Sequence, residues 1–161
     1  MTLGFILNGE DVVIQCSANE RLIDILRDKF HLMGAKAGCR LGRCGSCSVI
    51  FNGRVSPSCM IPAFKIRSSE IISIEGFSQT DEYQDIIHAF SRAGVETCSY
   101  CDTAKIFAAE NLLENNMRPN RDDALAALEG VLCRCTDPEV LANAFILAAE
   151  IRQRRLYGRN I

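Results

Sequence analysis

The sequence predicts an α+β protein in two parts, with strands in the N-terminal part and helices in the C-terminal part. Up to about Gly76, short runs of β-branched and aromatic residues alternate with Asn-Gly pairs. After that point these runs stop, and apolar residues recur at the spacing of amphipathic helices. Nine cysteines accompany this division, most of them in two tightly spaced sets, one in each part. We expect domains of residues 1–77 and 78–161.

Two hairpins and one helix are expected in the N-terminal part. Apolar residues 3–7 and 12–14 flank Asn-Gly, which is typical of a two-residue hairpin turn. Ser17 and Glu20 have the spacing of a capping box, and apolar residues then recur at helical spacing as far as Phe30. The sequence therefore predicts a helix that crosses the first hairpin.

The second hairpin and a last strand complete this part. Residues 49–51 and 54–55 flank another Asn-Gly pair, and residues 70–74 are apolar enough for a strand. Two hairpins, a crossing helix and a late strand resemble the β-grasp fold of ferredoxins.

Four helices with short connections are expected in the C-terminal part, which predicts a small bundle. They run from near Tyr83 to Gly94, through residues 106–113, from Asn120 to Gly130, and from Asp137-Pro138 through Ile151.

The first cysteine set has the spacing C-x4-C-x2-C, and a fourth cysteine follows after eleven intervening residues; the set comprises Cys39, Cys44, Cys47 and Cys59. Plant-type [2Fe–2S] ferredoxins space their ligands in this way, with two thiolates for each iron. A loop that bends round a cluster needs positions without a Cβ, which are supplied by Gly38, Gly42 and Gly45. A zinc knot or a set of disulfides is the alternative, although zinc ligands usually come in two C-x2–4-C pairs.

The second set pairs a C-x2-C with a C-x-C, each between two expected helices; it comprises Cys98, Cys101, Cys133 and Cys135. Four cysteines serve zinc and [2Fe–2S] equally well. A first cluster in the same chain favours a second one, because two clusters can exchange electrons and a zinc ion cannot. Arg134 lies between two of these cysteines, and either tunes the cluster or forms a salt bridge at a subunit surface.

Together the two sets resemble the small iron–sulfur subunit of the xanthine dehydrogenase family of molybdenum hydroxylases. The resemblance rests on residues 36–49, Cys59, Cys98, Cys101 and residues 132–136, and it covers essentially the whole chain. It implies two [2Fe–2S] clusters, the inner one next to a molybdopterin-binding large subunit. It also implies that electrons pass to an FAD-binding medium subunit and that this chain has no catalytic residue.

The chain departs from the family pattern around the second set. The family's Gln before the first cysteine, which contacts molybdopterin, is Thr97 here, and the following Gly is Ser99. Asp137-Pro138 replaces the family's Gly-Tyr. We therefore do not transfer the molybdopterin contact to Thr97.

Composition excludes several other classes of protein. The net charge of −2 gives no basic field for nucleic acid, and no apolar run is long enough for a membrane span. The N-terminus lacks the pattern of a secretory signal, so we expect a cytoplasmic location. Two other functions stay open: a free-standing two-cluster ferredoxin, and a non-redox scaffold that binds zinc.

Two further features have structural interpretations. Cys16 belongs to neither set and ends an apolar run, so we expect it in the core. The C-terminal basic run comprises Arg152, Arg154, Arg155 and Arg159. We interpret this run as a solvated helix end favoured by the helix dipole, with a docking surface as the alternative.

Overall fold

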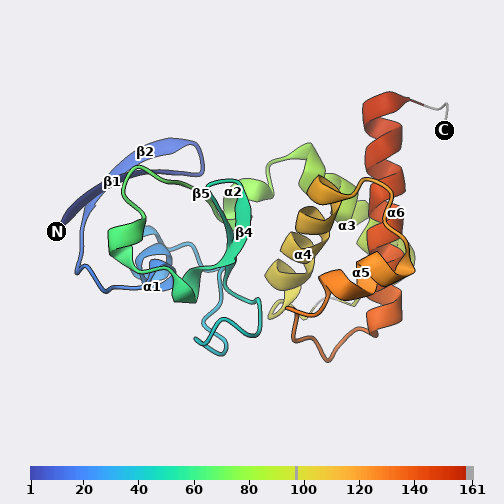
Figure 1. Ribbon diagram of the computed structural model, residues 1–161, viewed down its shortest axis with the longest axis horizontal. Coiled ribbons are helices and arrows are strands. Elements are labelled where there is room, and N and C mark those ends of the chain that lie inside the picture. Colours follow the sequence, from blue (N-terminus) through green and yellow to red (C-terminus); the bar gives the residue numbers. More distant parts are fainter. Residues whose placement is uncertain (97, 159–161) are drawn as a thin grey trace.

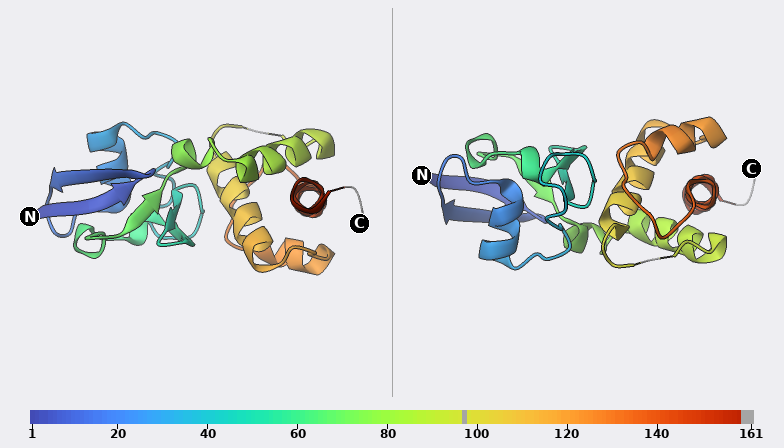
Figure 2. Two further views of the ribbon diagram at one scale, coloured as in Figure 1. Left: turned by 90° about the horizontal axis from the view of Figure 1, so that it is seen from above. Right: turned by 90° about the horizontal axis from the view of Figure 1, so that it is seen from below.

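The computed structural model describes residues 1–96 and 98–158, and its two parts lie side by side (Figure 1). Within these residues, the N-terminal part forms a five-stranded sheet and the C-terminal part is helical. The same arrangement is visible from above and below in Figure 2, where α6 lies on the side away from the sheet. The predicted α+β class is confirmed.

The sheet has the strand order β2-β1-β5-β3-β4. Its strands are β1 (Thr2–Leu7), β2 (Glu10–Gln15), β3 (Ser48–Phe51), β4 (Arg54–Pro57) and β5 (Glu70–Ile72). The central strand β5 is parallel to β1 and antiparallel to β3. It ends earlier than the sequence predicts, because the chain passes through Ser73 into helix α2 (Ile74–Phe77).

Both predicted hairpins are present, and their turns explain the Asn-Gly pairs. Asn8 and Gly9 have φ angles of 51° and 85°, and Asn52 and Gly53 have φ angles of 48° and 75°. Two successive positive φ angles define the turn type whose twist matches that of paired strands, and Asn and Gly tolerate them best.

The helix of the N-terminal part begins later than the capping pattern predicts. Helix α1 spans Leu22–Asp24 and continues as a π-helical segment, η1 (Ile25–Lys29). The N–H of Ser17 donates to the carboxylate of Glu20 at 3.2 Å, which is half of a capping box, yet no helix starts there. The carbonyl of Glu20 instead accepts from the N–H of Ala63 at 2.8 Å, which holds this segment to the loop after β4.

The helical part contains α3 (Asp81–Ala93), α4 (Asp102–Asn115), α5 (Arg121–Ala127) and α6 (Pro138–Tyr157). Three expected helix ends are confirmed. Asn120 and Asp123 form a reciprocal capping box at the start of α5, and the Asp137 side chain caps α6. Gly94 ends α3 in the left-handed conformation with a φ of 72°.

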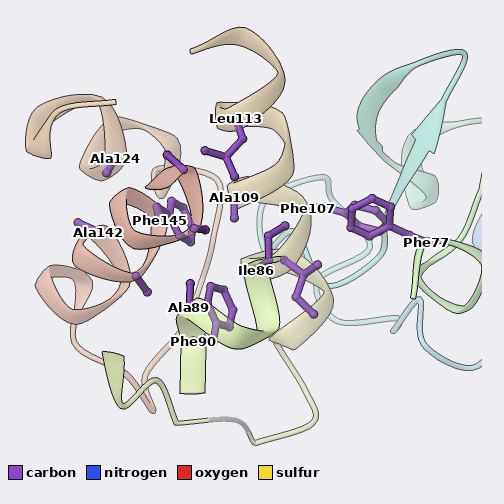
Figure 3. Close-up of a cluster of buried hydrophobic side chains, with 14 of the residues drawn as sticks. Phe77, Ile86, Ala89, Phe90, Phe107, Ala109, Leu113, Ala124, Ala142 and Phe145 are labelled. Atoms are coloured by element: carbon purple, nitrogen blue, oxygen red, sulfur yellow. The ribbon is translucent and has the colours of Figure 1, made fainter. Parts of the chain in front are cut away.

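The core of the helical part extends into the sheet (Figure 3). Phe90 of α3 and Phe145 of α6 stack with ring centroids 6.2 Å apart. Towards the sheet, Phe77 and Phe107 lie 5.4 Å apart, and Ile50 of β3 belongs to the same buried cluster. The two parts therefore share apolar surface as well as a linker.

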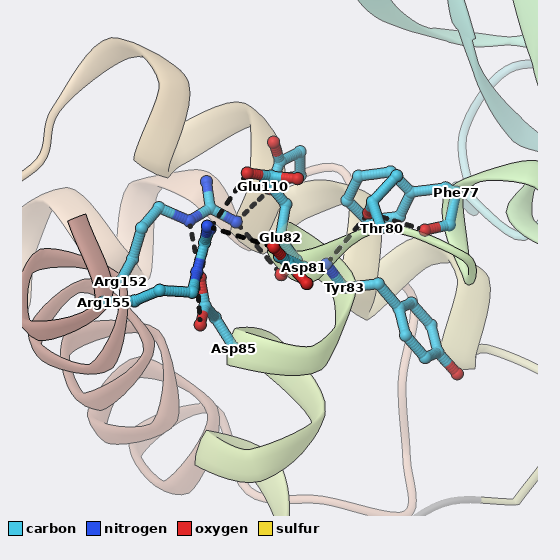
Figure 4. Close-up of polar contacts among 9 residues, drawn as sticks. All are labelled: Phe77, Thr80, Asp81, Glu82, Tyr83, Asp85, Glu110, Arg152 and Arg155. Carbon is cyan, nitrogen blue, oxygen red and sulfur yellow. Dashed lines mark hydrogen bonds and ion pairs between the residues drawn. The ribbon is translucent and has the colours of Figure 1, made fainter.

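The C-terminal arginines are not simply a solvated helix end, and this interpretation is corrected for two of them (Figure 4). Arg152 is buried and pairs with Asp85 at 3.4 Å and Glu110 at 2.6 Å. Arg155 is partly exposed and pairs with Asp85 at 2.9 Å. Arg154 is exposed, as expected, and the fourth arginine of the run, at position 159, lies outside the described residues. A buried ionic network thus joins α3, α4 and α6.

Cys16, which the sequence places in the core, is only half-buried and packs against the edge of the apolar core of the sheet. Among the described helices, none is both long and apolar enough to cross a membrane.

Candidate metal centres

The four cysteines of the first set, all among the described residues, lie on two segments that flank the second hairpin, and no three of their sulfurs lie within 4.8 Å of one another. Cys39, Cys44 and Cys47 lie on the loop between η1 and β3, and Cys59 lies in the short 3-10 turn after β4. Ser58 fixes this turn, because its N–H and its Oγ both donate to the carbonyl of Cys47, at 3.1 and 2.6 Å.

Within the first set the thiols are arranged as two pairs. The N–H of Cys39 points to Sγ of Cys44 at 3.5 Å. Cys47 and Cys59 lie together in a buried cluster with Ile23. Since each iron of a [2Fe–2S] cluster takes two thiolates, two pairs of thiols suit this group.

Backbone N–H groups surround the more exposed pair. The N–H groups of Leu41 and Arg43 both donate to Sγ of Cys39 at 3.3 Å, and they lower the pKa of this thiol to about 6. Burial has the opposite effect on Cys47 and raises its pKa to about 11. A ring of N–H donors around sulfur is the concavity that favours anions, so the loop is built for thiolates and sulfides.

The three glycines of this loop have different roles. A Cβ at Gly38 would lie 2.8 Å from Sγ of Cys44, so the sulfur takes the space of the missing side chain. Gly42 and Gly45 both have a φ of 72°, which favours glycine. A Cβ at Gly42 would approach Met60, and one at Gly45 would approach the helical part. These two positions therefore serve the turn and the close packing of the loop.

In the second set three sulfurs form one close group, and the fourth, that of Cys133, contacts this group through Cys135. Sγ of Cys101 lies 3.7 Å from that of Cys98 and 3.8 Å from that of Cys135. Sγ of Cys133 lies 3.3 Å from that of Cys135. In the described part of the chain, Cys98, Cys101 and Cys135 are the one group of three possible ligands within 4.8 Å of one another.

Helix starts position these sulfurs. Cys98 and Cys101 immediately precede α4, and Cys133 and Cys135 immediately precede α6, so both pairs lie at one end of the helical part, as predicted (Figure 1). Backbone N–H groups of Cys101 and Tyr100 lower the pKa of Cys98 to about 7. Burial raises the pKa of Cys101. Thiolates are therefore accessible near neutral pH on one side of this group.

The second set borders an open hollow of about 500 Å³. Its walls are the four cysteines with Tyr100, Leu132 and Arg134. Tyr100 and Leu132 are 53% and 64% exposed, so apolar surface surrounds the sulfurs. Arg134 is exposed, and no ion pair of its side chain is found among the described residues, which removes the support for a salt bridge within the chain.

The two sets lie next to each other across the junction of the two parts. The N–H of Leu132, the residue before Cys133, donates to the carbonyl of Cys44 at 3.3 Å. The Tyr100 hydroxyl lies 3.2 Å from the place that a Cβ on Gly38 would take. A single backbone hydrogen bond thus connects a residue beside one set with a cysteine of the other.

Lys105 is a residue of the second set's surroundings that the sequence patterns did not identify. Its side chain is fully buried, and its Nζ lies 3.3 Å from Sγ of Cys135. Its position in the sequence could have identified it, because Lys105 follows Cys101 by four residues at the start of a helix. Residues with this spacing lie on the same face of a helix.

Two domains with four cysteines each, arranged for thiolate ligation and placed side by side, define the class of iron–sulfur electron-transfer proteins. Comparison with known families supports this class in both parts. Residues 5–70 match the model of a 2Fe-2S iron-sulfur cluster binding domain. Residues 73–145 match that of a [2Fe-2S] binding domain. The chain thus has two [2Fe–2S] clusters as its cofactors, and zinc in the second set is not supported.

Known relatives narrow the class to one family. The chain is 38% identical to the nicotinate dehydrogenase small FeS subunit of Eubacterium barkeri, over 84% of this chain and 87% of the relative. It is 35% identical to a probable xanthine dehydrogenase subunit of Bacillus subtilis, over 81% of this chain and 75% of the relative.

A solved structure agrees with these relatives. Quinoline 2-oxidoreductase from Pseudomonas putida 86 matches with a TM-score of 0.87 at 30% identity, over 99% of this chain and 98% of that chain. The chain belongs to the family of small iron–sulfur subunits of xanthine dehydrogenase-type molybdenum hydroxylases. Its role is electron transfer within an oxidoreductase complex. The departure at Thr97 lies outside the described residues.

Proposed function

We propose that the chain relays electrons from a molybdopterin-binding large subunit, through its second and then its first cysteine set, to an FAD-binding medium subunit or another acceptor. When bound, the [2Fe–2S] clusters supply one-electron transfer. The observation that carries the proposal is the hydrogen bond from the N–H of Leu132 to the carbonyl of Cys44, because it joins the surroundings of the two sets directly.

The proposal assigns all eight cysteines of the two sets as cluster ligands. These are Cys39, Cys44, Cys47 and Cys59 for the first cluster and Cys98, Cys101, Cys133 and Cys135 for the second. Support for the first cluster comes from the paired thiols and from the N–H donors around Cys39. Support for the second comes from Sγ–Sγ distances of 3.3 to 3.8 Å.

Other residues of the chain hold, shield or polarise these sites. Gly42 and Gly45 allow the loop of the first set its left-handed turns. Ile23 packs beside Cys47 and Cys59 and excludes water from them. Arg134 adds positive charge at the hollow, where it would favour the more negative, reduced form of a cluster.

The hollow supports the order of the relay. The sulfurs of the second set lie at a surface whose apolar residues, Tyr100 and Leu132, are uncovered in the single chain. Uncovered apolar surface around functional groups is typical of a subunit interface. We therefore place the large subunit over this hollow and the acceptor on the side of Cys39 and Leu41.

The proposal includes two domains, residues 1–77 and 78–161, each with its own cluster, and a cytoplasmic location. The division between the domains lies where the sheet gives way to helices. Helix α2 connects the last strand, β5, with the first long helix, α3. The shared core around Phe77 and Phe107 packs the two parts against each other, so it would hold the two cluster sites in a fixed relation.

The cofactors that co-purify with the chain test the proposal, because molybdenum and flavin report the two partner subunits. The tagged chain is purified from its own cells, and iron, molybdenum and flavin are measured per chain. Two exposed leucines give matched variants: Leu132, which is 64% exposed beside the second set, and Leu41, which is 66% exposed beside the first. Leu132→Asp is expected to lose molybdenum and keep flavin, and Leu41→Asp is expected to do the reverse.

Other outcomes have definite meanings. If Leu132→Asp loses flavin and keeps molybdenum, the order of the relay is reversed. If the unchanged chain brings down neither molybdenum nor flavin, a free-standing two-cluster ferredoxin is the better account. Iron content must stay the same in both variants, because an altered partner content then reflects docking.

A further inference from the structure

Lys105 is a charged residue in the interior of the helical part. It lies in the first turn of α4, and its side chain is among the largest fully buried ones in the described residues. Burial of an ammonium group costs several kcal/mol unless hydrogen bonds and opposite charge compensate for it. The contacts of Lys105 therefore indicate what the charge is for.

The groups that contact the ammonium belong to the second set, its supporting loop or the start of α4. Nζ donates to the carbonyl of Glu96 at 2.7 Å, to Sγ of Cys135 at 3.3 Å and to Oγ1 of Thr136 at 3.4 Å. A carboxylate oxygen of Asp102 lies at 3.6 Å. This Asp102 oxygen is buried and accepts no hydrogen bond from the described residues, so it balances the ammonium by its charge.

The ammonium form is stabilised at this place. Its Nζ has a carbonyl oxygen, a hydroxyl oxygen, a sulfur and a carboxylate oxygen within 3.6 Å, and these acceptors together with the negative charge of Asp102 stabilise the charged form. The side chain thus brings a fixed positive charge and an N–H donor to a sulfur of the second set.

We propose that Lys105 sets the reduction potential of the second cluster by stabilising its reduced form, which rests on the assignment of Cys135 as a ligand. On reduction one electron enters from the donor, one ferric ion becomes ferrous, and no bond or proton is exchanged. The added negative charge strengthens both the N–H···S bond and the attraction to the ammonium. Hydrogen bonds to sulfur and the local net charge are among the factors that set the reduction potentials of such clusters.

A purely structural role makes a different prediction. If Lys105 only holds the Glu96 loop, its replacement would change stability and leave the potential of an assembled cluster unaltered. Asp102 separates the two roles, because its negative charge opposes that of Lys105 while its other oxygen accepts from the N–H of Ser99 at 2.9 Å. Asn at this position can still accept that hydrogen bond.

The test is a redox titration of the full chain with both clusters, monitored by electron paramagnetic resonance. The variants are Lys105→Met, which is close in length but neutral, Lys105→Gln, which keeps a donor, and Asp102→Asn. Lys65→Met, at an exposed position of the sheet part, is the control. The first cluster of the same molecule is an internal reference.

Lys105→Met is expected to lower the midpoint of the second cluster by at least the equivalent of a tenfold change in its one-electron equilibrium, about 59 mV. Lys105→Gln is expected to lower it less, and Asp102→Asn to raise it. The first cluster and the Lys65→Met control are expected not to shift.

Unaltered midpoints of the second cluster in the assembled variants would overturn the inference. If neither lysine variant assembles the second cluster, the direction of the Asp102→Asn shift decides the question, and a shift to lower potential would contradict the proposal. Failure of the proposed relay is recognised by a different measurement. In that case the unchanged protein co-purifies with neither molybdenum nor flavin, whatever the midpoint potentials of its clusters are.

Discussion

Gly45 and Ala104 are in close contact across the junction of the two parts of the chain. A Cβ on Gly45 would lie 3.0 Å from that of Ala104 and 2.8 Å from the carbonyl oxygen of Gly130. The loop of the first cysteine set can therefore approach the helical part only because position 45 has no side chain. This contact lies one residue from Cys44, whose carbonyl accepts the hydrogen bond from Leu132.

Substitution of Gly45 is expected to separate the two parts. Gly45→Ala combines a left-handed residue with overpacking, and we expect a loss of roughly 2–5 kcal/mol in the free energy of unfolding. Gly53→Ala is the control, because Gly53 has a similar φ of 75° but no atom within 4 Å of the Cβ position. It should lose only about 1–2 kcal/mol. Urea unfolding followed by circular dichroism compares the two variants, and equal losses would mean that the close contact is unimportant.

Removal of the buried arginine is expected to be costly. Arg152→Met leaves the buried carboxylates of Asp85 and Glu110 with fewer partners, and a broken buried pair costs about 3–5 kcal/mol. Arg154→Met removes an exposed partner of Glu150 on the same helix and should cost less than about 1 kcal/mol. Urea midpoints of the two variants give the comparison. Similar midpoints would show that the network around Arg152 adds little stability.

The stability that Arg152→Met loses is expected to depend on pH. Burial raises the pKa of Glu110 even beside Arg152, and without the arginine this pKa should rise further. A carboxyl whose pKa is higher in the folded than in the unfolded protein favours folding in its protonated form. Its contribution is therefore present below the unfolded pKa and is lost as the pH rises through the folded one. The deficit of Arg152→Met relative to Arg154→Met should shrink as the pH falls from about 8 to about 5, and a constant deficit would argue against this.

Thiol reactivity in the cluster-free chain should follow the local environment. The pKa of Cys39 is lowered to about 6 by backbone N–H donors, whereas burial raises that of Cys47 to about 11. Because the thiolate is the reactive form, iodoacetamide at about pH 7 should modify Cys39 well before Cys47. Peptide mass spectrometry at several times gives the order, and earlier labelling of Cys47 would contradict the arrangement of the loop.

Loss of one ligand in the second set is expected to spare the first cluster. Cys135→Ser removes a sulfur that lies 3.3 Å from Sγ of Cys133 and 3.8 Å from that of Cys101. The first set lies on separate loops of the sheet part, so its two irons should stay. Iron analysis and visible absorbance measure this outcome. Disappearance of both clusters together would mean that the two domains do not assemble independently.

The sequence predicted the features that depend on local geometry. The Asn-Gly turns, the cap at Asn120 and the glycine end at Gly94 each follow from a residue's own backbone preference, and each is present. Cysteine spacing predicted the candidate sites in the same way, because three cysteines of the first set share one loop.

Features that depend on tertiary partners could not be predicted in this way. The capping pattern at Ser17 gave no helix start, because the backbone there pairs with the loop near Ala63. Arg152 and Lys105 have the sequence context of solvated residues and are buried, because their partners come from other segments of the chain. The close approach at Gly45 likewise needs Ala104 and Gly130, which lie far away in the sequence.

The central claim is that this chain carries two [2Fe–2S] clusters, and metal content tests it most directly. Iron, acid-labile sulfide and zinc are measured per chain, with an electron paramagnetic resonance spectrum of the reduced protein. Two clusters of two irons each predict four irons, four sulfides and two distinct signals. Two irons, one zinc and a single signal would contradict the claim and make the second cysteine set a structural zinc site.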